Sequence, residues 1–475
     1  MLWRLALIAI AALCCGLAFW HAHKPMPPGT RIASPWYAVP SSEVGFIADI
    51  TAADAYGRPV VSQAIFDQVL GVVHRARDFI VIDYFLFNAA RSSAAGAAAP
   101  IRALSSELRD ALIERRRAQP ALRILLITDP INTPAGVPSN DFQMLRAAGV
   151  DIAVTEIGRL RDSSFLYSSL KRITSGWWSK SGGERRGALA TLLESGNHRR
   201  TIIADDGRGG LTGIIGSADP HDASSANSNA AAKLSGPALQ ELLASELAIA
   251  RFSGWSGTAG AAATAPAKER AALAEHTARI GFATESAARN TLLEHIDGAV
   301  QADAIDIAMC YLSERAVIES LLAANARGVR VRLILDPNKA GSAEASSSIP
   351  NGPVASELVT ASDGAIHVRW YRTHGEQFHT KLVMIYGAER LWFILGSADL
   401  TRRSLDDHDL TANVAIEVAR GTPLALQMKD YFETLWSNRA VLGIEYTADF
   451  GVYADSSQSS YWLYRLMEST GLASF

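Results

Sequence analysis

The feature that most constrains the fold is a sequence pattern that occurs twice. Residues 378–399 read FHTKLVMIYGAERLWFILGSAD, and residues 197–219 read NHRRTIIADDGRGGLTGIIGSAD. Each copy has a histidine and a basic residue two positions apart, two apolar runs, and the same Gly-Ser-Ala-Asp ending. Agreement at this many positions is improbable by chance, so we predict two equivalent structural units in one chain.

The spacing within each copy places its polar groups. His379 and Lys381, like His198 and Arg200, are two residues apart, so on a β-strand their side chains point to one face. The apolar runs are typical of buried strands. An imidazole, a cation and small hydrogen-bond donors are the groups that a phosphate site needs. The candidate site residues are His198, Arg200, Asp205, Ser217 and Asp219 in the first copy and His379, Lys381, Ser397 and Asp399 in the second.

The elements around each copy also repeat. Apolar periodicity predicts helices and strands in the same order before both copies, and a repeated β-α-β order predicts an α/β fold of two similar halves. The first half has expected helices at 60–77 and 101–118 and strands at 78–88, 122–129 and 150–155. The second has expected helices at 291–300 and 316–327 and strands at 304–314, 329–336 and 365–371.

Composition indicates where the chain divides. Residues 253–267 are of low complexity, and residues 24–42 are rich in Pro and Gly, so both are predicted to be connections. The predicted divisions are a membrane anchor or signal at 1–24, a linker at 25–42, the first half at 43–252, a linker at 253–280, the second half at 281–445 and a C-terminal tail at 446–475.

Two insertions interrupt the repeated order. Residues 342–363 are predicted to be a Ser-rich loop. Residues 159–197 mix basic side chains with aromatic ones, which is typical of a membrane interface or a segment that gates a substrate; a solvated helix face is the alternative. The aromatic residues of this insertion are Phe165, Tyr167, Trp177 and Trp178.

The N-terminus carries a membrane signal. Residues 5–20 are apolar and follow Arg4, although a bilayer span usually takes about 20 residues. A signal-peptide cleavage site needs small residues at the first and third positions before the cut. The best candidate cut, before His23, has Trp20 at the third position, so an uncleaved anchor is favoured over a cleaved signal peptide. Basic residues flank both ends, so the positive-inside rule discriminates weakly. We expect attachment to a bacterial inner membrane with the catalytic part outside the cytoplasm.

Charge and cysteine content exclude several classes. The net charge of −3 gives no overall basic field, so nucleic acid is an unlikely partner. Three cysteines, Cys14, Cys15 and Cys310, cannot form a disulfide framework or a metal cluster. We therefore expect chemistry without a metal or another cofactor.

These residues resemble the phospholipase D superfamily. Its HKD motif is a His, any residue, a Lys, four residues and an Asp, followed by a Gly-Ser-x-Asn turn. The match is strongest at His379-Thr380-Lys381, the second Gly-Ser-Ala-Asp segment and Ser404, and covers most of residues 78–436. The resemblance implies two α/β halves packed with pseudo-two-fold symmetry, whose motifs meet at one site. It also implies a phosphodiesterase or a phosphatidyltransferase.

This chain departs from the family pattern at four positions. Arg200 replaces Lys, Tyr386 replaces the second Asp, and Asp219 and Asp399 replace Asn. Arg holds phosphate as well as Lys does, through a fork of donors. A carboxylate beside a phosphate is unfavourable unless it is paired with a cation or protonated.

The pattern predicts a two-step displacement at phosphorus. One histidine forms a phosphohistidine, and the other protonates the leaving oxygen and then activates water or an alcohol. We assign attack to His198 and acid catalysis to His379, although the symmetry leaves the reverse open. Arg200 and Lys381 would neutralise the phosphoryl oxygens, Ser217 and Ser397 would donate hydrogen bonds, and Asp205 would orient a cation.

The favoured function is therefore that of a membrane-associated enzyme acting on phospholipid, with water or an alcohol as acceptor. An endonuclease of the same superfamily is one alternative, which the near-neutral charge and the membrane segment disfavour. A catalytically impaired protein that binds anionic lipid is the other, motivated by Tyr386 and the two aspartates.

Overall fold

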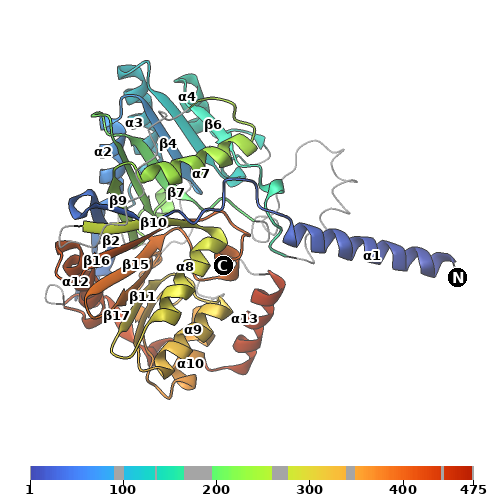
Figure 1. The fold of residues 1–475 in the computed structure, drawn as a ribbon, viewed down its shortest axis with the longest axis vertical. Coiled ribbons are helices and arrows are strands. Elements are labelled where there is room, and N and C mark those ends of the chain that lie inside the picture. The colour runs from blue at the N-terminus through green and yellow to red at the C-terminus, as the bar shows by residue number, and fades with distance from the viewer. Residues whose placement is uncertain are drawn as a thin grey trace.

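The computed structural model describes residues 2–89, 101–133, 136–164, 195–258, 277–338, 348–439 and 443–472. The predicted α/β fold is confirmed, because the described chain forms two mixed β-sheets covered by helices. Figure 1 shows one half above the other, with the N-terminal helix α1 (Leu2–His23) projecting from the body. The aromatic residues of the predicted insertion 159–197 lie within 165–194, outside the described residues.

The two sheets have the same strand order at their centres. In the first half the order is β3-β2-β9-β8-β7-β4-β5-β6, and in the second it is β1-β10-β16-β15-β14-β11-β12-β13-β17. The first-half strands are β2 (Val44–Ala53), β3 (Pro59–Ser62), β4 (Phe79–Tyr84), β5 (Arg123–Thr128), β6 (Asp151–Val154), β7 (Arg200–Asp205), β8 (Leu211–Gly216) and β9 (Asn229–Ser235). The second-half strands are β1 (Tyr37–Pro40), β10 (Thr277–Thr284), β11 (Ala304–Met309), β12 (Arg330–Leu335), β13 (His367–Tyr371), β14 (Lys381–Tyr386), β15 (Arg390–Gly396), β16 (Ala412–Ala419) and β17 (Thr447–Asp449).

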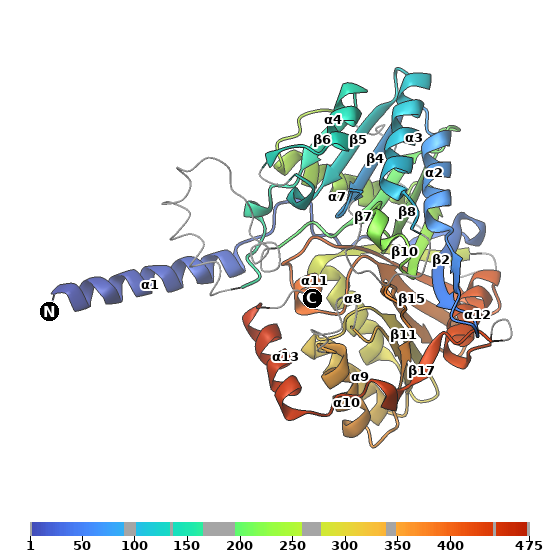
Figure 2. The same ribbon diagram turned by 180° about the vertical axis from the view of Figure 1, so that it is seen from behind.

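Helices cover both faces of each sheet. On the first sheet, α2, α3 and α4 share one face and α7 covers the other. The view from behind in Figure 2 shows α2, α3 and α4 side by side. The second sheet is covered in the same way by α8, α9 and α10 on one face and α12 on the other. The bounds are α2 (Ile65–Arg75), α3 (Leu104–Ala118), α4 (Asn140–Ala147), α7 (Leu239–Phe252), α8 (Glu285–Gly298), α9 (Arg315–Ala326), α10 (Asn351–Ala361) and α12 (Pro423–Ser437).

The apolar strands are buried on both faces, as their sequences predict. Along β4, Ile80 and Ile82 join the core under α2 and α3, whereas Val81 joins a core that both halves share. That shared core also contains Phe393 and Val414 of the second half. The halves therefore pack together through the inner faces of both sheets, over a continuous apolar interior.

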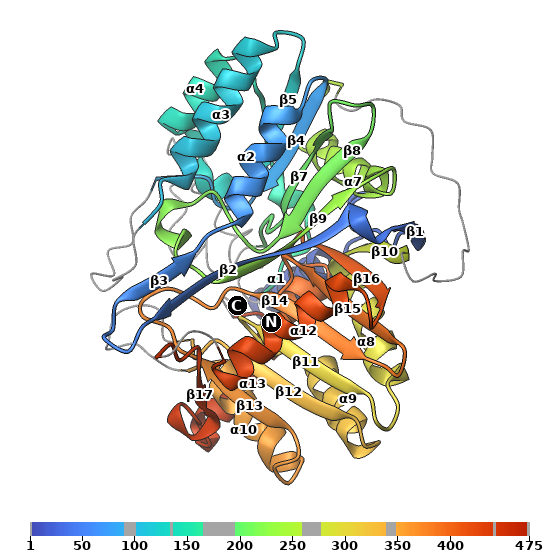
Figure 3. The ribbon, with the colours of Figure 1, turned by 90° about the vertical axis from the view of Figure 1, so that its left-hand side faces the viewer.

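The long strand β2 lies along the boundary between the halves, where Figure 3 shows α12 beside it. The Phe46 ring of β2 packs edge-on against Tyr431 of α12, with centroids 5.0 Å apart. The Gln427 side chain of the same helix donates a hydrogen bond of 3.3 Å to the Phe46 carbonyl. This contact joins strand β2 of the first half to a helix of the second.

Several predicted connections contain regular structure. Within the predicted linker 25–42, β1 pairs with β10 and so adds an edge strand to the second sheet. The predicted loop at 342–363 contains α10, whose buried residues Val354 and Leu358 are one helical turn apart. The predicted tail contributes β17, which pairs with β13, and α13 (Gln458–Thr470). These pairings join segments distant in sequence, which local composition does not reveal.

The predicted transmembrane segment finds no support in the structure. Among the described residues, no helix has both the length and the apolar character needed to cross a bilayer, and α1 is no exception. The end of α1 contacts the body, where the His21 carbonyl accepts a 3.0 Å hydrogen bond from the Asp162 N–H.

Candidate active site

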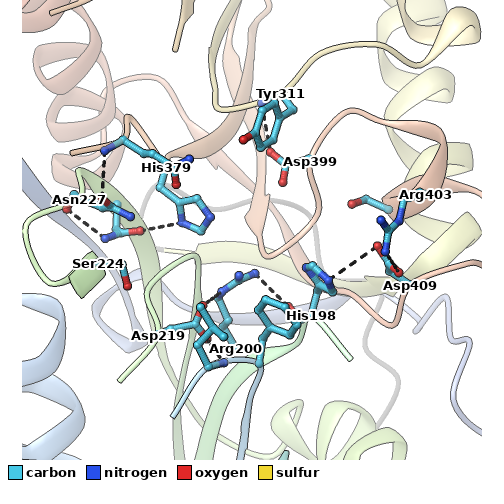
Figure 4. Close-up of a pocket in the computed structure, with 15 residues that line it drawn as sticks. His198, Arg200, Asp219, Ser224, Asn227, Tyr311, His379, Asp399, Arg403 and Asp409 are labelled. Atoms are coloured by element: carbon cyan, nitrogen blue, oxygen red, sulfur yellow. Dashed lines mark hydrogen bonds and ion pairs between the residues drawn. The ribbon is translucent and has the colours of Figure 1, made fainter. Parts of the chain in front are cut away.

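Both motif histidines line one cavity of about 180 Å³ between the halves (Figure 4). Residues of the two halves contribute to its wall in similar numbers, so neither half forms the site alone. The lining residues are Phe85, Leu86, His198, Arg200, Asp219, Ser224, Asn227 and Asn229 from the first half, and Tyr311, Gln377, His379, Asp399, Arg403, Ser404 and Asp409 from the second.

Strand alternation determines which motif side chains reach the cavity. His198 and Arg200 point into it, whereas Arg199 between them is fully buried and donates a hydrogen bond of 2.9 Å to Glu285 of the other half. In the second motif, the Thr380 hydroxyl likewise turns inward and lies 3.3 Å from the Tyr431 hydroxyl. The middle residue of each motif therefore packs inside the protein, whereas His198, Arg200 and His379 face the site.

Each histidine faces a polar side chain from the opposite half. The His379 Nδ1 lies 3.1 Å from the Asn229 amide oxygen, and the His198 Nε2 lies 3.9 Å from an Asp409 carboxylate oxygen. The His198 ring also stacks on Phe85, with centroids 3.9 Å apart. Sequence reasoning missed these three partners. The available signal was position, because Asn229 and Asp409 lie at or just before the start of the strand that follows each Gly-Ser-Ala-Asp turn.

Three cations around the cavity are each paired with a carboxylate. Arg200 contacts Asp219 at 2.6 Å and Lys381 contacts Asp399 at 3.2 Å. The third pair joins Arg403 to Asp409, also at 3.2 Å. The two aspartates that replace the family's asparagines are therefore each paired with the cation of their own motif, which is the condition under which such carboxylates are tolerated.

The two histidines are uncharged at pH 7. Burial lowers the pKa of His198 to about 3, an effect that Asp409 opposes and Arg200 reinforces. Burial, together with Lys381 and Arg200, lowers the pKa of His379 well below its usual range. The His198 side chain is still 27% exposed, so water in the cavity limits the decrease. An uncharged imidazole has a lone pair available for attack on phosphorus.

Asp409 remains ionised beside His198. Burial acts to raise the pKa of Asp409, but Arg403 and the Gly196 N–H together hold it below its ordinary value. The Gly196 N–H donates a hydrogen bond of 2.9 Å to this carboxylate. A negative charge therefore lies beside His198, whereas His379 faces the neutral amide of Asn229.

The two motif serines do not reach the cavity. The Ser217 hydroxyl donates to the Asn229 amide oxygen at 3.0 Å and accepts from the Ala230 N–H at 3.1 Å. The Ser397 hydroxyl accepts from the Ala412 N–H at 3.0 Å. Both serines are buried, so they hold the next strand in register, and Ser217 also orients the partner of His379.

The structure also does not bring Asp205 to the cavity. Asp205 is the last residue of β7, at the opposite end from His198, and its carboxylate accepts backbone N–H groups of residues 77–79 and of Gly207. Tyr386 holds the equivalent position at the end of β14. The replacement of Asp by Tyr in the second motif therefore removes no group from the cavity.

No metal site accompanies these groups in the part of the chain that the structure describes, where no cluster of three or more His, Cys, Asp or Glu side chains has the geometry to hold an ion. Catalysis without a metal remains a prediction.

Comparison with known proteins confirms the predicted resemblance to the phospholipase D superfamily in the second half of the chain. Residues 292–436 match the family model described as cardiolipin synthase, PLD-like domain. A search of curated proteins found no match. The family match thus lies in the second half, and the first half is related to it by the repeated strand order.

Solved structures extend the likeness to the whole chain at the level of fold. Phosphatidylserine synthase from Haemophilus influenzae Rd KW20 superposes with a TM-score of 0.56 at 11% identity, covering 92% of this chain and 94% of that one. Polyphosphate kinase from Porphyromonas gingivalis gives 0.45 at 12% identity, covering 90% and 56%. The phospholipase D family member Nuc from Salmonella typhimurium gives 0.26 at 18% identity, covering 33% and 95%. Only the first superposition is close enough to support a common fold.

Proposed function

We propose that the protein is a phospholipase D-like phosphodiesterase or phosphatidyltransferase that acts on phospholipid through a phosphohistidine. The observation that supports this most directly is the convergence of His198 and His379, from separate halves, on one cavity that also holds Arg200. Two imidazoles are the minimum for a displacement in which one attacks phosphorus and the other handles the proton. The packing of two halves with the same strand order also supports the pseudo-two-fold arrangement of the family.

The environment of each histidine favours one assignment of roles. Attack on phosphorus makes the imidazole of the nucleophile cationic, and a carboxylate beside it stabilises that charge. Asp409 lies beside His198, whereas His379 faces the amide of Asn229. We therefore assign attack to His198. His379 then transfers a proton to the leaving oxygen and, in the second step, removes one from water or an alcohol.

The cations hold the phosphoryl group during both steps. Arg200 lines the cavity beside Asp219, and Lys381 contacts Asp399, which also lines it. When a phosphodiester binds, each cation turns from its aspartate toward a phosphoryl oxygen. The negative charge of the bound phosphodiester raises the pKa of His379 from its lowered value. The imidazole of His379 then carries the proton that it gives to the leaving oxygen. Water as acceptor gives phosphatidic acid, and an alcohol gives a new phosphatidyl lipid.

We also propose that the protein is associated with a membrane. The supporting observation is the surface of α1, where large apolar side chains are exposed at positions including Trp3, Ile8, Leu13, Phe19 and Trp20. Such side chains partition into a bilayer interface. Our proposal keeps the expected attachment to a bacterial inner membrane, with the catalytic part outside the cytoplasm. Flotation of the purified protein with phospholipid vesicles tests the association.

The activity test uses a radiolabelled phosphatidyl lipid with and without a primary alcohol. We expect phosphatidic acid in water, a phosphatidyl alcohol when alcohol is present, and an acid-labile phosphoenzyme that is lost in His198→Ala. The control is His367→Ala, because His367 is exposed on β13, away from the cavity. Cleavage of nucleic acid without any lipid turnover would show that the endonuclease alternative is correct.

The catalytically impaired alternative is favoured by one observation. Asp219 and Asp399 form ion pairs with Arg200 and Lys381, the two cations that would otherwise bind a phosphate. The same labelling experiment decides between the two functions. A phosphoenzyme excludes an impaired binding protein, whereas lipid binding without a phosphoenzyme at any pH supports it.

A further inference from the structure

Resting on the proposed function, we propose that the cavity selects phosphodiesters whose head group carries a cationic amine, and that Asp399 with Tyr311 forms the amine subsite. The substrate class is therefore zwitterionic rather than anionic phospholipid. The inference comes from the balance of charge around the cavity and from the state of the Lys381–Asp399 pair.

The charges around the cavity cancel. Arg200, Lys381 and Arg403 supply three positive charges, and their partners Asp219, Asp399 and Asp409 supply three negative ones. Both histidines are uncharged at pH 7. A cavity built to attract an anionic ligand would have an excess of positive charge. This one instead presents closely spaced charges of both signs, which complement a ligand that also carries both signs.

The Lys381–Asp399 pair is the one most open to exchange. The Lys381 residue is 2% exposed, and its ammonium group has no hydrogen-bond partner among the described residues, although it lies 3.2 Å from Asp399. A buried ammonium normally donates hydrogen bonds, so the missing acceptor points to an oxyanion supplied by a ligand. The Asp399 side chain is 15% exposed, against 4% for Asp219, which leaves Asp399 as the more accessible of the two carboxylates.

A zwitterionic phosphodiester satisfies both members of this pair. Its phosphate oxygens accept from Lys381 and Arg200, and Asp399 then loses part of the positive charge that stabilised it. An ammonium on the same head group restores that charge to Asp399. A head group without an amine leaves Asp399 without that compensating charge, so the negative charges of the phosphodiester and the carboxylate repel each other.

The surroundings of Asp399 suit an ammonium group. Figure 4 shows Asp399 and Tyr311 together on one wall of the cavity, across from the Arg200–Asp219 pair. One Asp399 oxygen accepts a 3.1 Å hydrogen bond from the Tyr311 N–H, which fixes the carboxylate in place. An aromatic ring beside a carboxylate provides cation–π and ionic contacts to the same amine.

The test measures binding rather than turnover, so that it does not depend on the proposed chemistry. Calorimetric titrations of the full-length protein use three water-soluble diesters: glycerophosphocholine, glycerophosphoethanolamine and glycerophosphoglycerol. We expect the two zwitterionic compounds to bind about tenfold more tightly than the anionic one. Equal binding, or tighter binding of glycerophosphoglycerol, overturns the proposal.

The matched variants are Asp399→Asn and Asp406→Asn. The Asp399→Asn substitution restores the amide of the family pattern and keeps an oxygen for the Tyr311 N–H, so we expect the preference to vanish or reverse. Asp406 carries the same charge outside the cavity lining, so its variant should keep the tenfold preference. An unchanged preference in Asp399→Asn refutes the amine subsite. If Asp399→Asn does not fold, the wild-type titrations alone decide the proposal.

The outcomes separate this inference from the proposed function. Binding preference for zwitterions without a phosphoenzyme would support the subsite and refute the catalytic proposal. A phosphoenzyme without the preference would support the catalytic proposal and refute the subsite.

Discussion

Replacing Asp409 by Asn is the sharpest test of the assigned roles. The substitution keeps the shape of the side chain and removes the negative charge 3.9 Å from the His198 ring. It also leaves Arg403 without its carboxylate partner. Both changes disfavour a positive charge on His198, so we expect the step that forms the phosphohistidine to slow.

The size of the effect follows from the distance. Two unit charges about 4 Å apart interact by about 4 kcal/mol at an effective dielectric constant of about 20. Because the His198 side chain is 27% exposed to the cavity, water screens part of this interaction, and we expect a loss of about 3 kcal/mol. Each 1.36 kcal/mol changes a rate tenfold, so the first step should slow by roughly a hundredfold.

The assay is rapid-quench measurement of the phosphoenzyme with labelled phospholipid under single-turnover conditions. Asp406→Asn is the control, since Asp406 pairs with Arg289 and does not line the cavity. A first step within threefold of the wild-type rate, in a variant that unfolds at the wild-type temperature, would refute the role of Asp409. Slowing of the second step alone would assign attack to His379 instead.

Three further predictions concern stability. Asp205→Asn should lower the free energy of unfolding by about 1–3 kcal/mol, because the carboxylate satisfies several backbone N–H groups, yet leave the catalytic rate of the folded fraction unchanged; denaturant titration and initial rates check both. Arg199→Met should lower the free energy of unfolding by about 3–5 kcal/mol, because two buried carboxylates, Glu246 and Glu285, lose their cation. Replacing both glutamates by Gln in the same variant should restore most of this loss, as denaturant titration will show. Burial raises the pKa of Glu468 from 4.5 to about 7, so its protonated form stabilises the fold and that stabilisation disappears as pH rises from about 4.5 to 7. Glu468→Gln should therefore match the wild type below pH 4.5 and become progressively more stable than it up to pH 7, as thermal unfolding at a series of pH values will show.

The sequence was sufficient for features that depend on local periodicity. A period of two residues predicted that His198 and Arg200 share one side of the chain, and that His379 and Lys381 do the same. His198, Arg200 and His379 line the cavity. Lys381 lies just behind Asp399, where it is 1% exposed. The apolar runs identified the central strands because burial on both faces demands continuous apolar sequence.

Features that depend on contacts between distant segments could not be predicted. Asp409 and Asn229 reach the histidines only because the halves pack against each other. The strand β1 joins the second sheet although the first half separates the two in sequence. Asp205 was expected at the site because it belongs to the motif, but a strand of six residues carries its two ends about 17 Å apart, beyond the reach of a side chain.

In the proposed mechanism, the difference between Asn229 and Asp409 gives the histidines of two similar halves unequal roles. A two-step displacement needs one imidazole that tolerates a positive charge after attack and one that exchanges a proton readily. Two histidines in identical surroundings would compete for both tasks. Here a carboxylate held by Arg403 stabilises charge on His198, whereas a neutral amide fixes His379 without stabilising its cation to the same degree. Duplication of one half supplies both histidines, but the proposed division of labour between them also requires that their partner residues differ, as Asn229 and Asp409 do.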